Sequence, residues 1–174
     1  GRRSGDCRAS CRWAHDSEYW RLLGSDIPVL WSVKKTKEWI EKEQLKEDGK
    51  NIFFMIRALE EDKLIGGIGL DGIDWSNGEA FVGIGLGERE YWGKGYGTDA
   101  MRLFLNYAFT ELNLRRVSLN VFEYNPRAFR SYLKAGFQEE GRMRKYLNRD
   151  RQRWDLIFMG ILREEWEANQ DLAR

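Results

Sequence analysis

The chain is poor in residues that bind metals or form covalent cross-links. It contains two cysteines, Cys7 and Cys11, and one histidine, His15. These are too few for a structural zinc site, which takes about four ligands of this kind. We therefore expect no metal site and no disulfide, and interpret the cysteines as reduced thiols of a cytoplasmic protein.

Two further absences exclude classes of protein. No apolar run approaches the ~18 residues of a membrane-spanning helix, and no cleavable leader is evident. The formal net charge of +1 is far from the basic surface of a nucleic-acid-binding protein. We expect neither a membrane nor a nucleic-acid partner. Without repeats or linkers, the 174 residues are expected to form one domain, residues 1–174.

The most informative stretch begins with a predicted strand at residues 81–86, in which Gly83 and Gly85 alternate with apolar residues. Glycine weakens a strand, so its repetition indicates the close approach of a ligand or another backbone. A glycine-rich turn at residues 92–98 leads into a helix with one buried face. Such a helix start binds phosphate, because its first N–H groups have no partner and its dipole is positive there. The apolar face comprises Met101, Phe104, Leu105, Ala108 and Leu112.

Two common phosphate motifs fit this turn poorly. A P-loop would place Ser or Thr after Lys94 to hold magnesium, but Gly95 stands there. The dinucleotide fingerprint matches in letters at Gly95, Gly97 and Ala100. However, it lies about nine residues beyond the strand, and no acidic residue closes a second strand ~20 residues later. An NAD-binding oxidoreductase is therefore kept only as an alternative.

A family motif fits better. The segment from Trp92 to Ala100, W-G-K-G-Y-G-T-D-A, resembles the coenzyme A loop of ribosomal-protein-alanine (Rim-type) N-acetyltransferases in the GNAT superfamily. Residues 125–144 are similar to N-x-x-A-x-x-x-Y-x-K-x-G-F-x-x-E-G-x-x-R of that branch. The resemblance is dense over residues 63–166 and thin before them. The family loop opens with Arg or Gln, whereas this sequence has Trp92; we interpret this as a branch feature, because backbone groups do most of the phosphate binding.

The resemblance implies an acetyl-CoA-dependent N-acetyltransferase whose acceptor, a small primary amine or a protein N-terminus, attacks the thioester directly. In the family, two strands separate and the pantetheine arm of acetyl-CoA lies between them, so residues 81–137 are the expected cofactor-binding core. A CoA-binding module without catalysis is a further alternative, and we expect a monomer or homodimer. The residues expected to bind the cofactor are Ile84, Gly85, Leu86, Trp92, Gly93, Lys94, Gly95, Tyr96, Gly97, Thr98 and Asn125.

Two residues are candidates for proton transfer. Tyr132 occupies the position of the family's tyrosine that protonates the CoA thiolate, and a phenol with a pKa near ~10 suits that task. A packing role for Tyr132 is the alternative. Glu88 is the candidate general base among several acidic residues near strand ends, although water could carry the proton instead. Asn125 could contact the CoA arm or act only as a helix cap.

The sequence also predicts the order of elements. Early helices, one at Val33–Lys46, precede three strands, a helix, a strand, a second helix and a final hairpin. We expect an α/β (α+β) fold, a GNAT-like, mixed and mostly antiparallel twisted sheet flanked by helices. The first strand of the family is missing or weak; it either precedes residue 1 or has degenerated. We leave open whether residues 1–15 are poorly ordered. The predicted strands are Ile52–Leu59, Leu64–Ile73, Phe81–Leu86, Val117–Phe122, Gln138–Leu147 and Arg153–Leu162.

Overall fold

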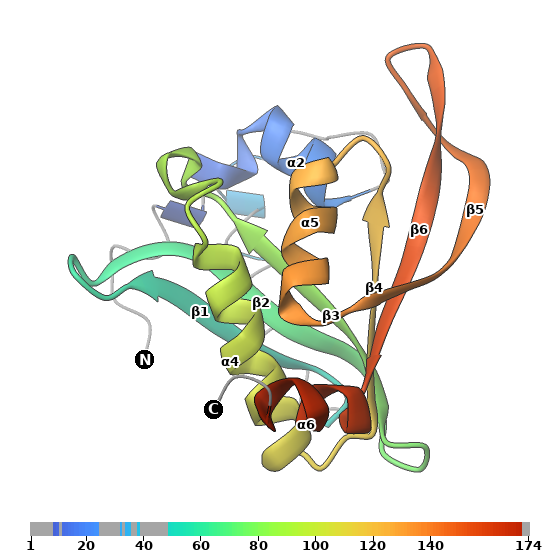
Figure 1. Cartoon of the computed structure of the whole chain (residues 1–174). Coiled ribbons are helices and arrows are strands. Elements are labelled where there is room, and N and C mark those ends of the chain that lie inside the picture. The colour runs from blue at the N-terminus through green and yellow to red at the C-terminus, as the bar shows by residue number, and fades with distance from the viewer. Residues whose placement is uncertain are drawn as a thin grey trace.

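The computed structural model describes residues 9–10, 12–24, 32, 34–35, 38 and 49–171. Six strands form one sheet in the order β1-β2-β3-β4-β6-β5 (Figure 1). All neighbouring strands are antiparallel except β3 and β4, which are parallel, so the predicted mixed sheet is confirmed. The strands are β1 (Ile52–Ala58), β2 (Lys63–Asp74), β3 (Glu79–Leu86), β4 (Arg116–Phe122), β5 (Gln138–Arg149) and β6 (Gln152–Leu162).

The helices are α2 (Ser17–Leu23), α4 (Tyr96–Thr110), α5 (Pro126–Ala135) and α6 (Arg163–Asp171), with a short 3₁₀ helix at Arg89–Tyr91. Helix α5 has the predicted boundaries. The Asn125 side chain accepts a hydrogen bond from the Ala128 N–H at 3.2 Å, and Gly136, with φ 106°, ends the helix. Helix α6 was not predicted, because Trp166 is the one bulky apolar residue of its first turns and gives no periodicity. Trp166 anchors the helix, because its ring packs on the Phe109 ring with the two centroids 5.4 Å apart.

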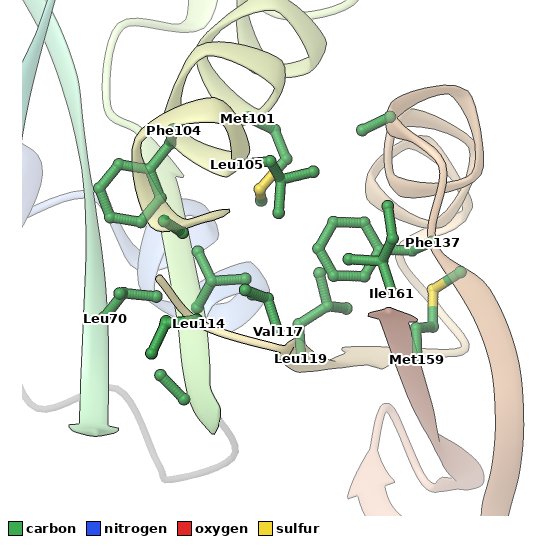
Figure 2. Packing of buried hydrophobic residues seen from close by; sticks show 14 of the residues in the cluster. Leu70, Met101, Phe104, Leu105, Leu114, Val117, Leu119, Phe137, Met159 and Ile161 are labelled. Carbon is green, nitrogen blue, oxygen red and sulfur yellow. The ribbon is translucent and has the colours of Figure 1, made fainter. Parts of the chain in front are cut away.

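The main core lies between the sheet and helices α4 and α5 (Figure 1). Figure 2 shows Met101 and Leu105 of α4 pointing at sheet residues such as Val117 and Leu119. Met101 and Leu105 are both fully buried, which confirms the predicted inner face of this helix. Burying a side chain of this size contributes about 1.5–3 kcal/mol, so this layer fixes α4 firmly on the sheet.

The N-terminal residues pack on β3 from the opposite face. Residues 9–10 and 12–14 are helical, so the described part of the stretch 1–15, whose order was left open, is structured. The reason is Trp13, which is 8% exposed and packs with Leu64. A Cβ on Gly87 would lie 2.0 Å from the Trp13 ring, so this glycine makes room for the indole.

Two predictions on the N-terminal part fall largely outside the described residues. Both cysteines are among the residues that the structure does not describe, so their expected reduced state stays a prediction. Most of the predicted helix Val33–Lys46 also lies outside the description, although residues 34–35 and 38 are helical. Within the described ranges, β1 is the outermost strand on its side of the sheet.

Strands β3 and β4 separate after a short paired region. Their parallel pairing joins Glu79–Phe81 to Arg116–Ser118 and stops at Phe81. On the other side of β3, the Gly87 N–H donates to the Ile65 carbonyl of β2 at 2.9 Å. Antiparallel pairing alternates from residue to residue, so the backbone groups of Ile84 and Leu86 point away from β2. Residues 82–86 thus present an open edge toward the gap between β3 and β4.

Candidate active site

A cavity of about 280 Å³ lies beside the open edge of β3. Ten of the predicted site residues line it, namely Ile84, Gly85, Leu86, Trp92, Gly93, Gly95, Gly97, Thr98, Asn125 and Tyr132. The structure therefore brings together residues from the strand, the turn, and helices α4 and α5, as the sequence predicted. Lys94, Tyr96 and Glu88 are not among the lining residues.

Sequence reasoning missed two groups of lining residues. The apolar face of α2 contributes Tyr19, Leu22 and Leu23, and α5 contributes Arg127, Arg130, Ser131 and Lys134. The α5 set could have been found from its spacing, because residues three, four and seven apart share one face of a helix. The α2 set carries no such signal, since only the tertiary fold places that helix at the cavity.

The glycine loop, residues 92–98, has a backbone that other residues would strain. Gly93 has φ 74° and Gly95 has φ 93°, and a Cβ at either position would meet no protein atom within 4 Å. Glycine is favoured at these positions because of the left-handed backbone conformation, and not because a neighbouring group leaves no room for a side chain. Gly95 is also the N-cap of α4 and makes no side-chain hydrogen bond. The N–H groups of the first turn are therefore available to an anion.

Two neighbours shape the start of α4. Tyr96 is not a lining residue, and its ring packs on that of Tyr91, which does line the cavity, with the ring centroids 5.0 Å apart. Thr98 is held toward α5 by a hydrogen bond between its hydroxyl and that of Ser131 at 2.7 Å. The first turn of α4 is thus fixed against the first two turns of α5.

Trp92 lies at the opening of the glycine loop, where the family motif has Arg or Gln. Its indole N–H donates to the Leu86 carbonyl at 2.7 Å, on the open edge of β3. The Arg127 guanidinium lies 4.0 Å from the centroid of the indole ring, and that of Arg89 lies 5.5 Å away. Both distances are within the range of cation–π contacts.

Tyr132 extends from the second turn of α5 into the cavity. Its ring packs edge-on against Phe137, with centroids 6.1 Å apart, beside the main core. Burial raises the pKa of the phenol to about 12, so the hydroxyl stays protonated at physiological pH. No group in the described part of the chain forms a hydrogen bond with that hydroxyl. It remains available as a proton donor to a bound molecule.

Asn125, only 8% exposed, is used first of all as a cap. Its side-chain oxygen accepts the Ala128 N–H, and its own backbone N–H donates to the Phe122 carbonyl at 2.7 Å. The structural role predicted for it is therefore present. A contact with the CoA arm stays a prediction.

Glu88, the predicted base, does not face the cavity. Its carboxylate accepts hydrogen bonds from Arg12 at 2.6 Å and from the Trp13 indole at 2.9 Å, and Lys63 lies 3.7 Å away. Burial would raise its pKa, but these hydrogen bonds and the two cations lower it on balance. A carboxylate held ionised by three partners is a weak proton acceptor, so we assign Glu88 to fixing the N-terminal residues on β3.

The two glycines of the predicted strand 81–86 have different surroundings. A Cβ on Gly85 would lie 2.6 Å from the Tyr19 hydroxyl and 3.1 Å from Leu23, so α2 covers this glycine. Gly83 has no atom within 4 Å of such a Cβ. The glycine at position 85 therefore makes room for Tyr19 while it also lines the cavity, and the open edge of β3 offers its backbone groups to a ligand.

The site combines a glycine loop at the N-terminus of α4 with a sheet that opens between the parallel strands β3 and β4. Residues 2–138 match the family model described as an acetyltransferase (GNAT) domain. The chain is a GNAT acetyltransferase. It is 30% identical over 162 residues to the N-acetyltransferase p20 of Bacillus licheniformis, covering 92% of this chain and 89% of the relative. This acetyltransferase accordingly uses acetyl-CoA as its co-substrate and acetylates an amine.

Two further similarities concern this acetyltransferase's relatives. The candidate ribosomal N-acetyltransferase YdaF of Bacillus subtilis is 34% identical over 112 residues, 64% of this chain and 61% of the relative. A spermidine N-acetyltransferase of Vibrio cholerae, solved in complex with CoA and spermine, superposes with a TM-score of 0.82. It is 25% identical, with 95% of each chain covered.

Two features are absent from the described residues of this acetyltransferase. No group of three or more His, Cys, Asp or Glu side chains is placed there to hold a metal ion. No helix in those ranges is long and apolar enough to cross a membrane.

Proposed function

We propose that this enzyme acetylates protein N-terminal amines, as the Rim-type branch does, by direct attack of the amine on acetyl-CoA. The observation that carries the proposal is the cavity where the glycine loop, the open edge of β3 and the Tyr132 hydroxyl meet. Direct attack is supported by the lining, which in the described residues contains no cysteine or histidine. Its one serine, Ser131, is engaged with Thr98.

The glycine loop is proposed to hold the pyrophosphate of acetyl-CoA. Gly93 and Gly95 leave space for the anion, and the uncapped N-terminus of α4 supplies N–H donors. The open edge of β3 would pair with the amides of the pantetheine arm, as a neighbouring strand does. Because Trp92 already occupies the Leu86 carbonyl, the Leu86 N–H is the group left to donate to the thioester oxygen.

Tyr132 is proposed to protonate the departing thiolate. It lies on the cavity side of α5, and its raised pKa keeps the hydroxyl protonated, so that it can donate its hydrogen to the thiolate. Glu88 is unsuited to accept the proton of the amine, since it faces the N-terminal residues. Water, the alternative that the sequence left open, takes this role in our proposal.

The lining also bears on the acceptor. The α2 side of the cavity is formed by Tyr19, Leu22 and Leu23, which suit an uncharged backbone segment. Among the described lining residues there is no carboxylate, whereas Arg127, Arg130 and Lys134 are present. A polycation would find no counter-charge there, while an N-terminal amine brings a single charge that it loses before attack. A polyamine is the second candidate, favoured by the overlap with the Vibrio cholerae spermidine enzyme.

Turnover of matched acceptors tests this proposal. The purified chain is mixed with acetyl-CoA and one of four amines: a hexapeptide beginning with Ala, the same peptide with a blocked N-terminus, spermidine, or spermine. Thiol release and product mass are measured. We expect acetylation of the free peptide and none of the blocked one. Turnover of polyamines alone would replace the proposed acceptor by the second candidate, and absence of acetyl-CoA binding would contradict the whole proposal.

A further inference from the structure

The family loop motif opens with Arg or Gln, and this chain has Trp92 at that position. An Arg from another element, Arg127, lies against the Trp92 ring. Its guanidinium is 4.0 Å from the centroid of the Trp92 ring, and both residues line the cavity. Arg127 is the second residue of α5, so it approaches the glycine loop from the opposite wall.

The Trp92 ring is a fixed platform for this Arg. The hydrogen bond from its indole N–H to the Leu86 carbonyl sets the ring's orientation. Arg89 lies at 5.5 Å from the same ring and is itself clamped by two hydrogen bonds to Asp16, at 2.8 and 2.6 Å. A guanidinium stacked on such a ring loses little further freedom when its edge N–H groups bind a ligand.

The charge of Arg127 is not balanced by an ion pair. Among the described residues no carboxylate lies within ion-pair distance of it, and Glu18 acts on it only through space. Loss of hydration lowers the pKa of Arg127, although the guanidinium remains charged. It shares the cavity with the positive N-terminus of α4, with Arg130 and with Lys134. Together these positive groups favour the binding of an anion in the cavity.

We propose that Arg127, stacked on Trp92, binds the pyrophosphate of acetyl-CoA in place of the Arg or Gln that opens the family loop. The α4 N-terminus holds the anion from one side and the guanidinium fork from the other. Trp92 is a positioning residue that acts through Arg127. This inference rests on the proposed function, because it assigns a contact within the same cofactor site.

The experiment measures dissociation constants by calorimetry for CoA and for 3′-dephospho-CoA. Wild type is compared with Arg127→Ala, Trp92→Leu and the double variant. Arg115→Ala is the matched control, since it removes one positive charge from a side chain that is 72% exposed and does not line the cavity. The kcat/KM for S-acetylpantetheine, which lacks the phosphates, is measured alongside.

For Arg127→Ala we expect affinity for CoA and for dephospho-CoA to fall equally, by about 10- to 100-fold, as for a lost charge-assisted hydrogen bond. The control should bind as wild type, and S-acetylpantetheine should react unchanged. As a single substitution, Trp92→Leu should weaken CoA binding. In the double variant it should cause little loss of affinity beyond that of Arg127→Ala, because its effect passes through the guanidinium.

Three results would overturn the inference. Unchanged CoA affinity in Arg127→Ala would remove the contact, and a loss for CoA but not for dephospho-CoA would move it to the 3′-phosphate. An equal loss with S-acetylpantetheine would mean general damage to the site. If the wild-type protein did not bind CoA, the proposed function would be wrong. If wild type and Arg127→Ala bound CoA equally well, only the inference about Arg127 would be wrong.

Discussion

Replacing Gly95 by Ala separates backbone strain from ligand binding. Gly95 has φ 93° and lines the cavity, and a Cβ there would meet no protein atom within 4 Å. In the free enzyme, the new methyl group should therefore destabilise the fold only through the strain of a left-handed backbone conformation. In the complex, it would occupy the place of the proposed pyrophosphate. Gly72 of β2 offers a matched control, because it has φ 62°, an equally empty surrounding and no place in the cavity.

The magnitudes allow the two effects to be distinguished. A non-glycine residue in this region costs about 1–2 kcal/mol, and 1 kcal/mol lowers Tm by about 2–4 °C in a chain of this size. Both Gly95→Ala and Gly72→Ala should thus melt about 2–8 °C below wild type without ligand. CoA at 100 times its Kd adds about 2.7 kcal/mol, or about 5–11 °C.

The assay is thermal unfolding with and without CoA at a fixed protein concentration. We expect the upward shift with CoA in wild type and in Gly72→Ala, and a much smaller one in Gly95→Ala. If Gly95→Ala melted lower yet kept the full ligand shift, the glycine loop would not be the pyrophosphate site.

Three further predictions concern chemistry and stability. Tyr132→Phe should lower kcat by about 10²- to 10⁴-fold with unchanged CoA affinity by calorimetry, and a near wild-type kcat would leave Tyr132 only its packing role. Because burial raises its pKa to about 12, kcat should show no loss from this phenol below pH ~10. Glu88→Gln should keep kcat but lose about 1 kcal/mol of stability in urea unfolding at pH 7. The lowered pKa of Glu88 means that this contribution is present above its ordinary value of 4.5 and disappears as pH falls through the folded value, so a difference persisting at pH 3 would contradict the assignment. EDTA should leave turnover unchanged, and inactivation of a still-folded protein by EDTA would reveal a metal.

The sequence predicted the elements whose signals are local. Asn125 with Pro126 marked the start of α5, Gly136 marked its end, and alternation located the strands. These signals work because capping and side-chain alternation depend on residues only a few positions apart. The glycine loop was found for the same reason, since its backbone needs are visible in the sequence around Gly95.

What the sequence could not give depends on contacts between distant residues. Gly85 was interpreted as a point of close approach by a ligand or another backbone, but the group found against it is the side chain of Tyr19, which is more than 60 residues away in the chain. Glu88 was predicted as a base from its position at a strand end, and only the fold shows Arg12 and Trp13 against it. The roles assigned to residues of the cavity remain predictions until they are measured.

The early end of pairing between β3 and β4 sets a limit on how stable this protein can become. Each further ladder pair beyond Phe81 would add hydrogen bonds and close the sheet. The same pairs would fill the slot that we assign to the pantetheine arm. Selection for thermal stability alone would therefore favour variants that close the gap, and these would be well folded and inactive. Libraries screened for heat resistance should be counter-screened for CoA binding, because this part of the sheet trades one property against the other.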